Sequence, residues 1–153
     1  MTNFHVAVGD RVKFAKTVAE SDIYQFAGIT GDFAGNHVNE EYMKRSVYGR
    51  RIAHGALLIG FMSTASTMMI ARARDGRGAN GTDGADGEET PVSLGYDRIR
   101  FLAAVFIGDT IEVSYAIAEV DPARRRSRAK IEVVNQDGKT VAVGEHILKW
   151  VGN

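Results

Sequence analysis

GALLIGFMSTASTMMIA, residues 55–71, contains no charged side chain and is apolar on nearly every face of a helix. A helix on a protein surface would show a polar stripe, so we expect this helix to be enclosed by other structure at the centre of the fold. A membrane-spanning helix is the alternative, but it needs about 20 apolar residues. The stretch is shorter than that and is diluted by four hydroxyl-bearing residues, namely Ser63, Thr64, Ser66 and Thr67. We therefore expect no contact with a membrane.

Shorter elements precede this central helix. Residues 8–20 alternate between apolar and polar side chains, as a half-buried strand does. Residues 21–30 place apolar side chains at helical spacing, and Ser21 can cap that helix. Residues 31–37 have the composition of a loop, and residues 39–45 again follow a helical pattern.

The second half of the chain is rich in strand signals. Residues 72–91 are rich in glycine and poor in large apolar side chains, so we interpret them as a surface insertion. Short turn signals separate the runs that follow. The expected strands are 92–105, 110–120, 126–135 and 140–151. The order of elements predicts an α+β fold in which an antiparallel sheet wraps the long central helix.

Composition narrows the possible functions. The 153 residues, 44% of them hydrophobic, suffice for one domain with a substantial core, which we expect to span residues 1–153. Because 19 basic residues balance 19 acidic ones, the chain has no net positive charge that would favour the binding of nucleic acid. The chain has no cysteine, which excludes disulfides, thiolate metal sites and cysteine nucleophiles. The first residues do not have the pattern of a secretory or transit peptide, so a cytoplasmic location is expected.

A loop between two predicted helices holds a carboxylate and an imidazole five residues apart, at Asp32 and His37. One group can take a proton from water while the other donates one, if both lie near a common substrate atom. Formation of a turn by Asp32 is the alternative. Further on, IAHG at residues 52–55 opens the central helix, whose first N–H groups lack partners within the helix. Since Gly55 has no side chain to keep a carbonyl oxygen away, we expect an oxyanion site at that end.

Two further groups of polar residues carry weaker signals. A metal site formed by Asp32, His37 and His54 is conceivable, but the spacings typical of zinc sites are absent and we expect no metal. Arg98 and Arg100 could hold the phosphates of a nucleotide-bearing substrate. A basic cluster in a predicted turn could do the same or could simply be solvated, and it comprises Arg124, Arg125, Arg126 and Arg128.

Three segments together resemble a known family. FAGITGDFAGNH (26–37), YGRRIAHGALL (48–58) and RIRFLAAVFIGDTI (98–111) are similar to the MaoC-type (R)-specific enoyl-CoA hydratases, which have the hot-dog fold. The resemblance runs from about residue 8 to the end of the chain, apart from the glycine-rich insertion. It implies a sheet wrapped around the central helix, a homodimer or higher homo-oligomer, and hydration of a trans-2-enoyl-CoA without a cofactor.

The resemblance also assigns roles to residues. Asp32 and His37 correspond to the catalytic pair, and the Gly55 N–H corresponds to the donor that polarises the thioester carbonyl. Ser63 matches a family position near the active site. We expect the acyl chain to lie along the central helix, near Leu57, Leu58 and Phe61, with the phosphates of CoA near arginines such as Arg98 and Arg100.

The chain departs from the family pattern at two places. Ala34-Gly35 stands where the family usually has Asn-Pro, and Ala104 replaces the expected proline. Loss of the proline removes a restraint on φ, so the loop that holds His37 could be more mobile unless packing compensates. A hot-dog thioesterase is one alternative, but residues 55–71 contain no acid to act as base or nucleophile. A non-catalytic acyl-thioester binding module is the other.

Overall fold

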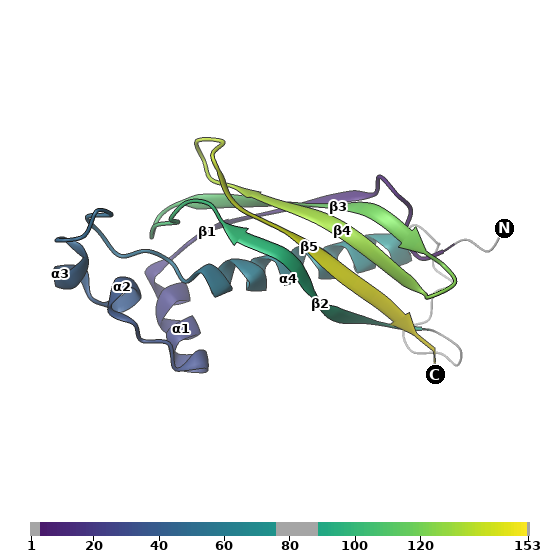
Figure 1. The fold of residues 1–153 in the computed structure, drawn as a ribbon, viewed down its shortest axis with the longest axis horizontal. Coiled ribbons are helices and arrows are strands. Elements are labelled where there is room, and N and C mark those ends of the chain that lie inside the picture. The colour runs from purple at the N-terminus through teal and green to yellow at the C-terminus, as the bar shows by residue number, and fades with distance from the viewer. Residues whose placement is uncertain (1–3, 76–88, 153) are drawn as a thin grey trace.

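The computed structural model describes residues 4–75 and 89–152. One antiparallel sheet of five strands, in the order β1-β3-β4-β5-β2, curves over a long helix (Figure 1). Three shorter helices gather at the N-terminal end of the long helix, far from both chain termini (Figure 1). The elements are β1 (Arg11–Thr17), α1 (Glu20–Thr30), α2 (Gly35–Val38), α3 (Glu40–Met43), α4 (Gly55–Asp75), β2 (Thr90–Phe101), β3 (Thr110–Asp121), β4 (Arg126–Val134) and β5 (Thr140–Val151).

The core lies between α4 and the inner face of the sheet. Strand β3 alternates between buried and less buried residues, and its inward side chains include Ile111, Val113 and Tyr115. Helix α4 buries residues at helical spacing against this face: Leu57, Leu58, Phe61, Met62, Ala65, Ser66 and Met69. Each large apolar side chain removed from water contributes about 1.5–3 kcal/mol. The predicted α+β fold, with an antiparallel sheet around a long helix, is confirmed.

The opposite face of α4 is open, which corrects the expectation that the helix is enclosed on every side. Small and hydroxyl-bearing residues occupy that face, and Met68 is 39% exposed there. Within residues 55–71 the exposed residues are Ala56, Gly60, Ser63, Thr64, Thr67, Met68 and Ala71. By length and composition α4 could cross a membrane. Because its other face packs against the sheet, we interpret it as the core helix of a globular fold.

Several predicted boundaries were wrong. Helix α4 continues through 72–75, so the predicted insertion begins in helix, and Thr90 and Pro91 already belong to β2. The remainder of that insertion, residues 76–88, lies outside the described residues. Ser21 does not cap α1, because the helix begins at Glu20. The carboxylate of Asp22 instead accepts a hydrogen bond from the Ala19 N–H (2.8 Å).

A polar group sits inside the sheet at His146 of β5, which is only 1% exposed. Its Nδ1 shares a hydrogen bond with the Tyr115 hydroxyl and its Nε2 with the Ser93 hydroxyl, both at 2.8 Å. The Tyr96 ring stacks on the imidazole at a centroid distance of 4.4 Å. Burial lowers the pKa of His146 to about 4 and raises the pKa of Tyr115 to about 12. The neutral imidazole therefore links β5 to β2 and β3.

Candidate functional site

The chain reverses direction immediately before Asp32. Helix α1 ends at Gly31, which has a left-handed conformation (φ 83°) and donates its N–H to the Ala27 carbonyl at 2.8 Å. Glycine adopts this conformation without the steric cost of a Cβ. Asp32 follows with an exposed side chain, and its Oδ1 accepts a hydrogen bond from the Ala34 N–H (3.3 Å). The carboxylate thus supports a turn, as the alternative interpretation expected, and also faces the site.

His37 lies in α2, a single turn of helix that the sequence did not predict within its loop. The imidazole is 8% exposed, and its Nδ1 lies 2.8 Å from the Ile52 carbonyl oxygen. A carbonyl oxygen only accepts, so Nδ1 carries the proton and, in the neutral ring, Nε2 has a free lone pair. The backbone supports the same contact, because the Ile52 N–H donates to the Asn36 carbonyl at 3.1 Å. The ring is therefore held in the tautomer that a proton acceptor requires.

His54 lies directly behind these two groups. Its ring stacks on that of His37, with centroids 3.8 Å apart and an interplanar angle of 27°. Its Nε2 donates a hydrogen bond to the backbone carbonyl of Asp32 at 2.9 Å. The side chain is 1% exposed, and among the described residues its Nδ1 has no hydrogen-bond partner.

The N-terminus of α4 completes the site. Ala53, two residues before the helix, donates its N–H at 2.7 Å to the carbonyl of Val105, in the segment that follows β2. Helix α4 begins at Gly55. A Cβ built on Gly55 would lie 2.7 Å from the Phe101 ring, so the ring packs against the glycine backbone. Only glycine allows this close approach without displacing the ring.

Arg51 fastens the helices that surround the site. Its guanidinium donates to Glu20 of α1 at 2.5 Å and to Glu40 of α3 at 2.8 Å, while its side chain is only 13% exposed. The hydrogen bond that the Arg51 guanidinium donates to the Glu20 carboxylate raises the pKa of Arg51 above its usual range. The ion pairs therefore join the start of α1 and the start of α3 to the segment that precedes α4.

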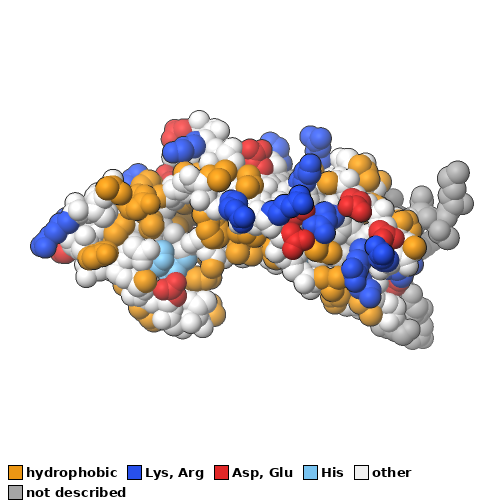
Figure 2. Space-filling model, in the orientation of Figure 1, with side chains coloured by type: hydrophobic (Ala, Val, Ile, Leu, Met, Phe, Trp, Pro, Cys, Tyr) orange, Lys and Arg blue, Asp and Glu red, His pale blue; other side chains and the backbone are white. Residues whose placement is uncertain are grey.

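His37 and Gly55 line one cavity of about 400 Å³. Figure 2 shows histidine surface beside an acidic side chain, within mainly apolar surroundings. The Asp32 carboxylate lies within 4.8 Å of a ring nitrogen of His37. The other lining residues are Asn36, Tyr48, Ile52, Ala53, Ala56, Leu58, Phe101, Leu102, Ala103, Ala104 and Val105. The structure thus brings the predicted acid, imidazole and helix N-terminus together.

The other predicted substrate-binding residues are more scattered. Leu58 lines the cavity, whereas Leu57 and Phe61 are buried in the core against the sheet. Ser63 lies farther along α4, near the Tyr96 hydroxyl. Arg100 is exposed and donates to the carbonyl of its neighbour in β2 at 2.7 Å.

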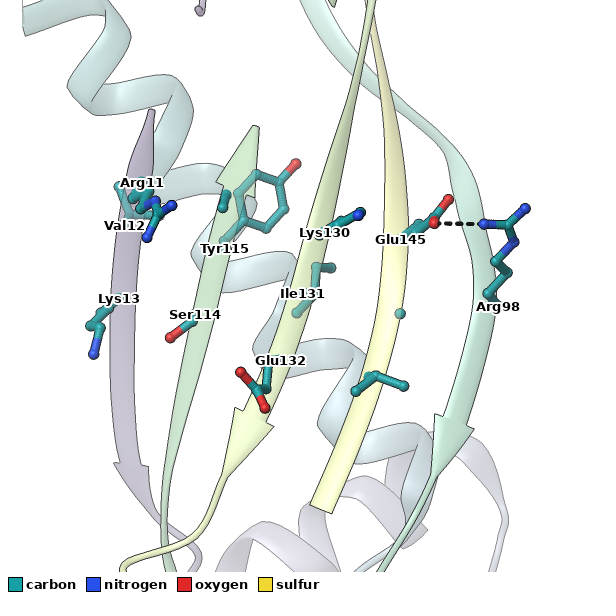
Figure 3. Close-up of a pocket in the computed structure, with 13 residues that line it drawn as sticks. Arg11, Val12, Lys13, Arg98, Ser114, Tyr115, Lys130, Ile131, Glu132 and Glu145 are labelled. Carbon is teal, nitrogen blue, oxygen red and sulfur yellow. Dashed lines mark hydrogen bonds and ion pairs between the residues drawn. The ribbon is translucent and has the colours of Figure 1, made fainter. Parts of the chain in front are cut away.

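Arg98 lies at a different cavity from His37 and Gly55. It lines a cavity of about 680 Å³ on the face of the sheet turned away from α4 (Figure 3). Its guanidinium pairs with Glu145 at 3.1 Å, as the dashed line in Figure 3 shows. A register shift between Asp97 and Arg100 and a positive φ of 54° at Arg98 mark a β-bulge there. The bulge turns Arg98 away from the cavity that holds His37.

The basic cluster at the β3–β4 turn is largely engaged with acidic residues. Arg128 pairs with Asp97 at 2.9 Å and with Glu145 at 2.8 Å. Arg125 pairs with Glu89, and Arg124 lies 3.6 Å from Asp121. These pairs favour the interpretation of the cluster as a charged hairpin end.

Asp32, His37 and His54 could also be considered as metal ligands, because one ligand atom from each lies within 4.8 Å of the others. The sequence analysis considered this grouping, and the packing of His54 against His37 brings its members together. Imidazoles coordinate in the plane of the ring, and zinc ligands converge at about 2.0–2.2 Å from the ion. One nitrogen of each ring already bonds a backbone carbonyl, that of Ile52 for His37 and that of Asp32 for His54, and the arrangement leaves His37 Nε2 for acid–base chemistry.

Sequence reasoning missed much of the cavity wall. Tyr48 and the run 101–105 lie within the motifs quoted for the family resemblance, but they were not identified as lining residues. His54 was considered only as a possible metal ligand. Its contacts depend on the packing of separate segments, which no local pattern encodes.

Comparison with known proteins agrees with this geometry. The chain is 33% identical over 117 residues to an (R)-specific enoyl-CoA hydratase of Rhodospirillum rubrum, covering 76% of this chain and 69% of the relative. It is 34% identical over 134 residues to a 3-hydroxybutyryl-CoA dehydratase of Methylorubrum extorquens, covering 88% and 74%. An (R)-hydratase structure from A. caviae shares the fold, with a TM-score of 0.74, 19% identity, and coverage of 94% and 96%. The model of the MaoC like domain matches residues 3–142. The chain therefore belongs to the MaoC-like dehydratase family, whose (R)-hydratases have the hot-dog fold.

Proposed function

We propose that this protein is a lyase that reversibly hydrates trans-2-enoyl-CoA to (R)-3-hydroxyacyl-CoA. The proposal rests on one observation: the same cavity is lined by His37, whose Nε2 has a free lone pair, and by Gly55 at the N-terminus of α4. The two curated relatives named above are a hydratase and a dehydratase, which are the two directions of this reaction.

The residues divide the reaction between them. In the hydration direction, Asp32 and His37 orient a water molecule, and His37 Nε2 accepts a proton as the water oxygen bonds to C3 of the enoyl group. Electrons of the C2–C3 double bond shift toward the thioester, whose oxygen becomes an enolate. That oxygen accepts a hydrogen bond from the Gly55 N–H, which lies at the positive end of the α4 dipole. A proton returned to C2 completes the addition of one water.

The wall of the cavity suits the acyl part of the substrate. Leu58, Phe101 and Leu102 offer apolar surface next to Gly55. We place the acyl chain there, rather than along Leu57 and Phe61, because those two side chains are already packed in the core.

We also propose that the protein acts as a homo-oligomer. Large apolar side chains are exposed near the cavity, including Val47 (98%) and Leu102 (57%). The open face of α4 and the edge strand β2 offer further surface for a second copy. A stable interface between two copies requires burial of more than about 1,000 Å² of surface. Analytical ultracentrifugation of the purified protein would then show a dimer or a larger species.

The decisive experiment is hydration of crotonyl-CoA, followed as loss of the enoyl-thioester absorbance. Asp32→Asn and His37→Ala should each lower kcat at least about a hundredfold, because positioned acid–base groups contribute 10²–10⁴-fold. Lys130→Gln, on the outer face of the sheet, is the control and should keep the wild-type rate. Full activity in both site variants would exclude this function. Release of free CoA without hydration would indicate a thioesterase instead.

A further inference from the structure

His54 contacts every part of the proposed catalytic machinery, although it does not line the cavity. Its Nε2 holds the Asp32 backbone at 2.9 Å, its ring supports the His37 ring at 3.8 Å, and it is joined to Gly55 by a peptide bond. The Phe26 ring of α1 also packs on it, with centroids 4.7 Å apart. One side chain thus connects α1 and the loop that follows it to the start of α4.

The burial of His54 supports a specific role. Its Nδ1 is buried without a hydrogen-bond partner in the described part of the chain, and such an atom costs stability. An apolar side chain of similar size would avoid that cost. Histidine is therefore advantageous here only if its other nitrogen, or the face of its ring, is used.

We infer that His54 is the positioning residue that sets Asp32 and His37 against the N-terminus of α4. The inference rests on the proposed function. The hydrogen bond from Nε2 fixes where the Asp32 loop lies. The stacked ring prevents His37 from turning about the bond from its Nδ1 to the Ile52 carbonyl. A displacement of about 1 Å at such a site can lower the rate about a hundredfold.

Three variants separate the two contacts. His54→Gln can keep a donor near the position of Nε2 but loses the ring. His54→Phe keeps a ring against His37 but loses the donor, and His54→Leu loses both. We expect kcat to fall about tenfold in the Gln and Phe variants and about a hundredfold in the Leu variant, with KM within threefold of wild type. Melting temperatures identify any variant whose loss of rate reflects unfolding.

Hydrogen exchange of the backbone amides in residues 31–38 gives a measure that does not depend on turnover. We expect faster exchange in the Phe and Leu variants and exchange close to wild type in the Gln variant. If kcat stays within threefold in all three folded variants, or if exchange rises equally in all three, the inference is wrong. If the wild type hydrates no enoyl thioester, the proposed function fails, and the exchange pattern still decides whether His54 positions the loop.

Discussion

Lowering the pH tests whether the imidazole of His146 is buried and neutral in the folded protein. The ring is neutral in the folded protein because burial lowers its pKa from 6.5 to about 4. In the unfolded chain the same ring titrates near 6.5. Between these values the unfolded state binds more protons than the folded state, so the free energy of unfolding falls as the pH falls. The contribution of the neutral His146 ring to the free energy of unfolding is fully present above about pH 6.5 and is lost as the pH falls to about 4.

The size of this effect follows from the difference in pKa. One unit corresponds to about 1.4 kcal/mol, so a shift from 6.5 to about 4 represents roughly 3 kcal/mol in total. Between pH 7 and pH 5 the loss is about 2 kcal/mol, because the folded ring is still neutral at pH 5. His146→Gln has no such titration. The variant should be less stable at pH 7, where it loses a hydrogen bond to Tyr115 or Ser93.

Urea unfolding of both proteins at one protein concentration measures the effect. The gap in unfolding free energy between wild type and His146→Gln should narrow by about 2 kcal/mol from pH 7 to pH 5. Carboxylates titrate alike in both proteins and cancel in the difference. A gap that stays constant to within about 0.5 kcal/mol would refute a neutral, buried imidazole, since no proton uptake would then accompany unfolding.

Other substitutions test the site. Gly55→Ala should lower kcat/KM about tenfold with little loss of stability, because the new Cβ displaces the Phe101 ring into the cavity. Steady-state kinetics measure the change in kcat/KM, and a thermal melt measures the change in stability. Gly35→Pro should raise the free energy of unfolding by about 0.4–1 kcal/mol without loss of activity. Ala34 already has the extended backbone that a following proline requires (φ −57°, ψ 140°), and proline suits the first position of a helix. Urea unfolding measures the gain. Arg98→Gln should leave KM for crotonyl-CoA within twofold, and a tenfold rise would restore Arg98 as a substrate-binding residue.

The sequence predicted the parts of the fold that depend on local periodicity. The strand signals of 110–120 and the uncharged run 55–71 predicted a strand and a central helix, and both are found. The end of α4 was missed because its last turn, ARARD, is polar and exposed, so it has the composition of the loop that follows it. Composition separates buried from exposed residues more readily than it separates an exposed helix end from a loop.

The site was predictable where one segment carries the chemistry and unpredictable where segments pack together. Asp32, His37 and Gly55 lie in short motifs; His37 and Gly55 line one cavity, and the Asp32 carboxylate lies within 4.8 Å of a ring nitrogen of His37. Arg98 could not be placed by counting alternate residues, because the bulge in β2 breaks the period of two. The role of His54 depends on contacts with residues 17 and 22 positions away, which no pattern in its own segment reveals.

The start of α4 shows how stability and function compete at one position. A helix in a globular protein is usually preceded by Ser, Thr, Asp or Asn, whose side chain bonds the free N–H groups of the first turn. Here His54 takes that position; its backbone carbonyl accepts from the Leu57 N–H at 3.1 Å, while its side chain turns away to the Asp32 carbonyl. A capping side chain would accept from the N–H of Ala56 or Leu57 and add about 1 kcal/mol of stability, but its oxygen would lie over the helix end where we propose that the Gly55 N–H binds the enolate oxygen. The histidine side chain leaves that helix end open and uses its own hydrogen bond to hold the loop that contains Asp32 beside it.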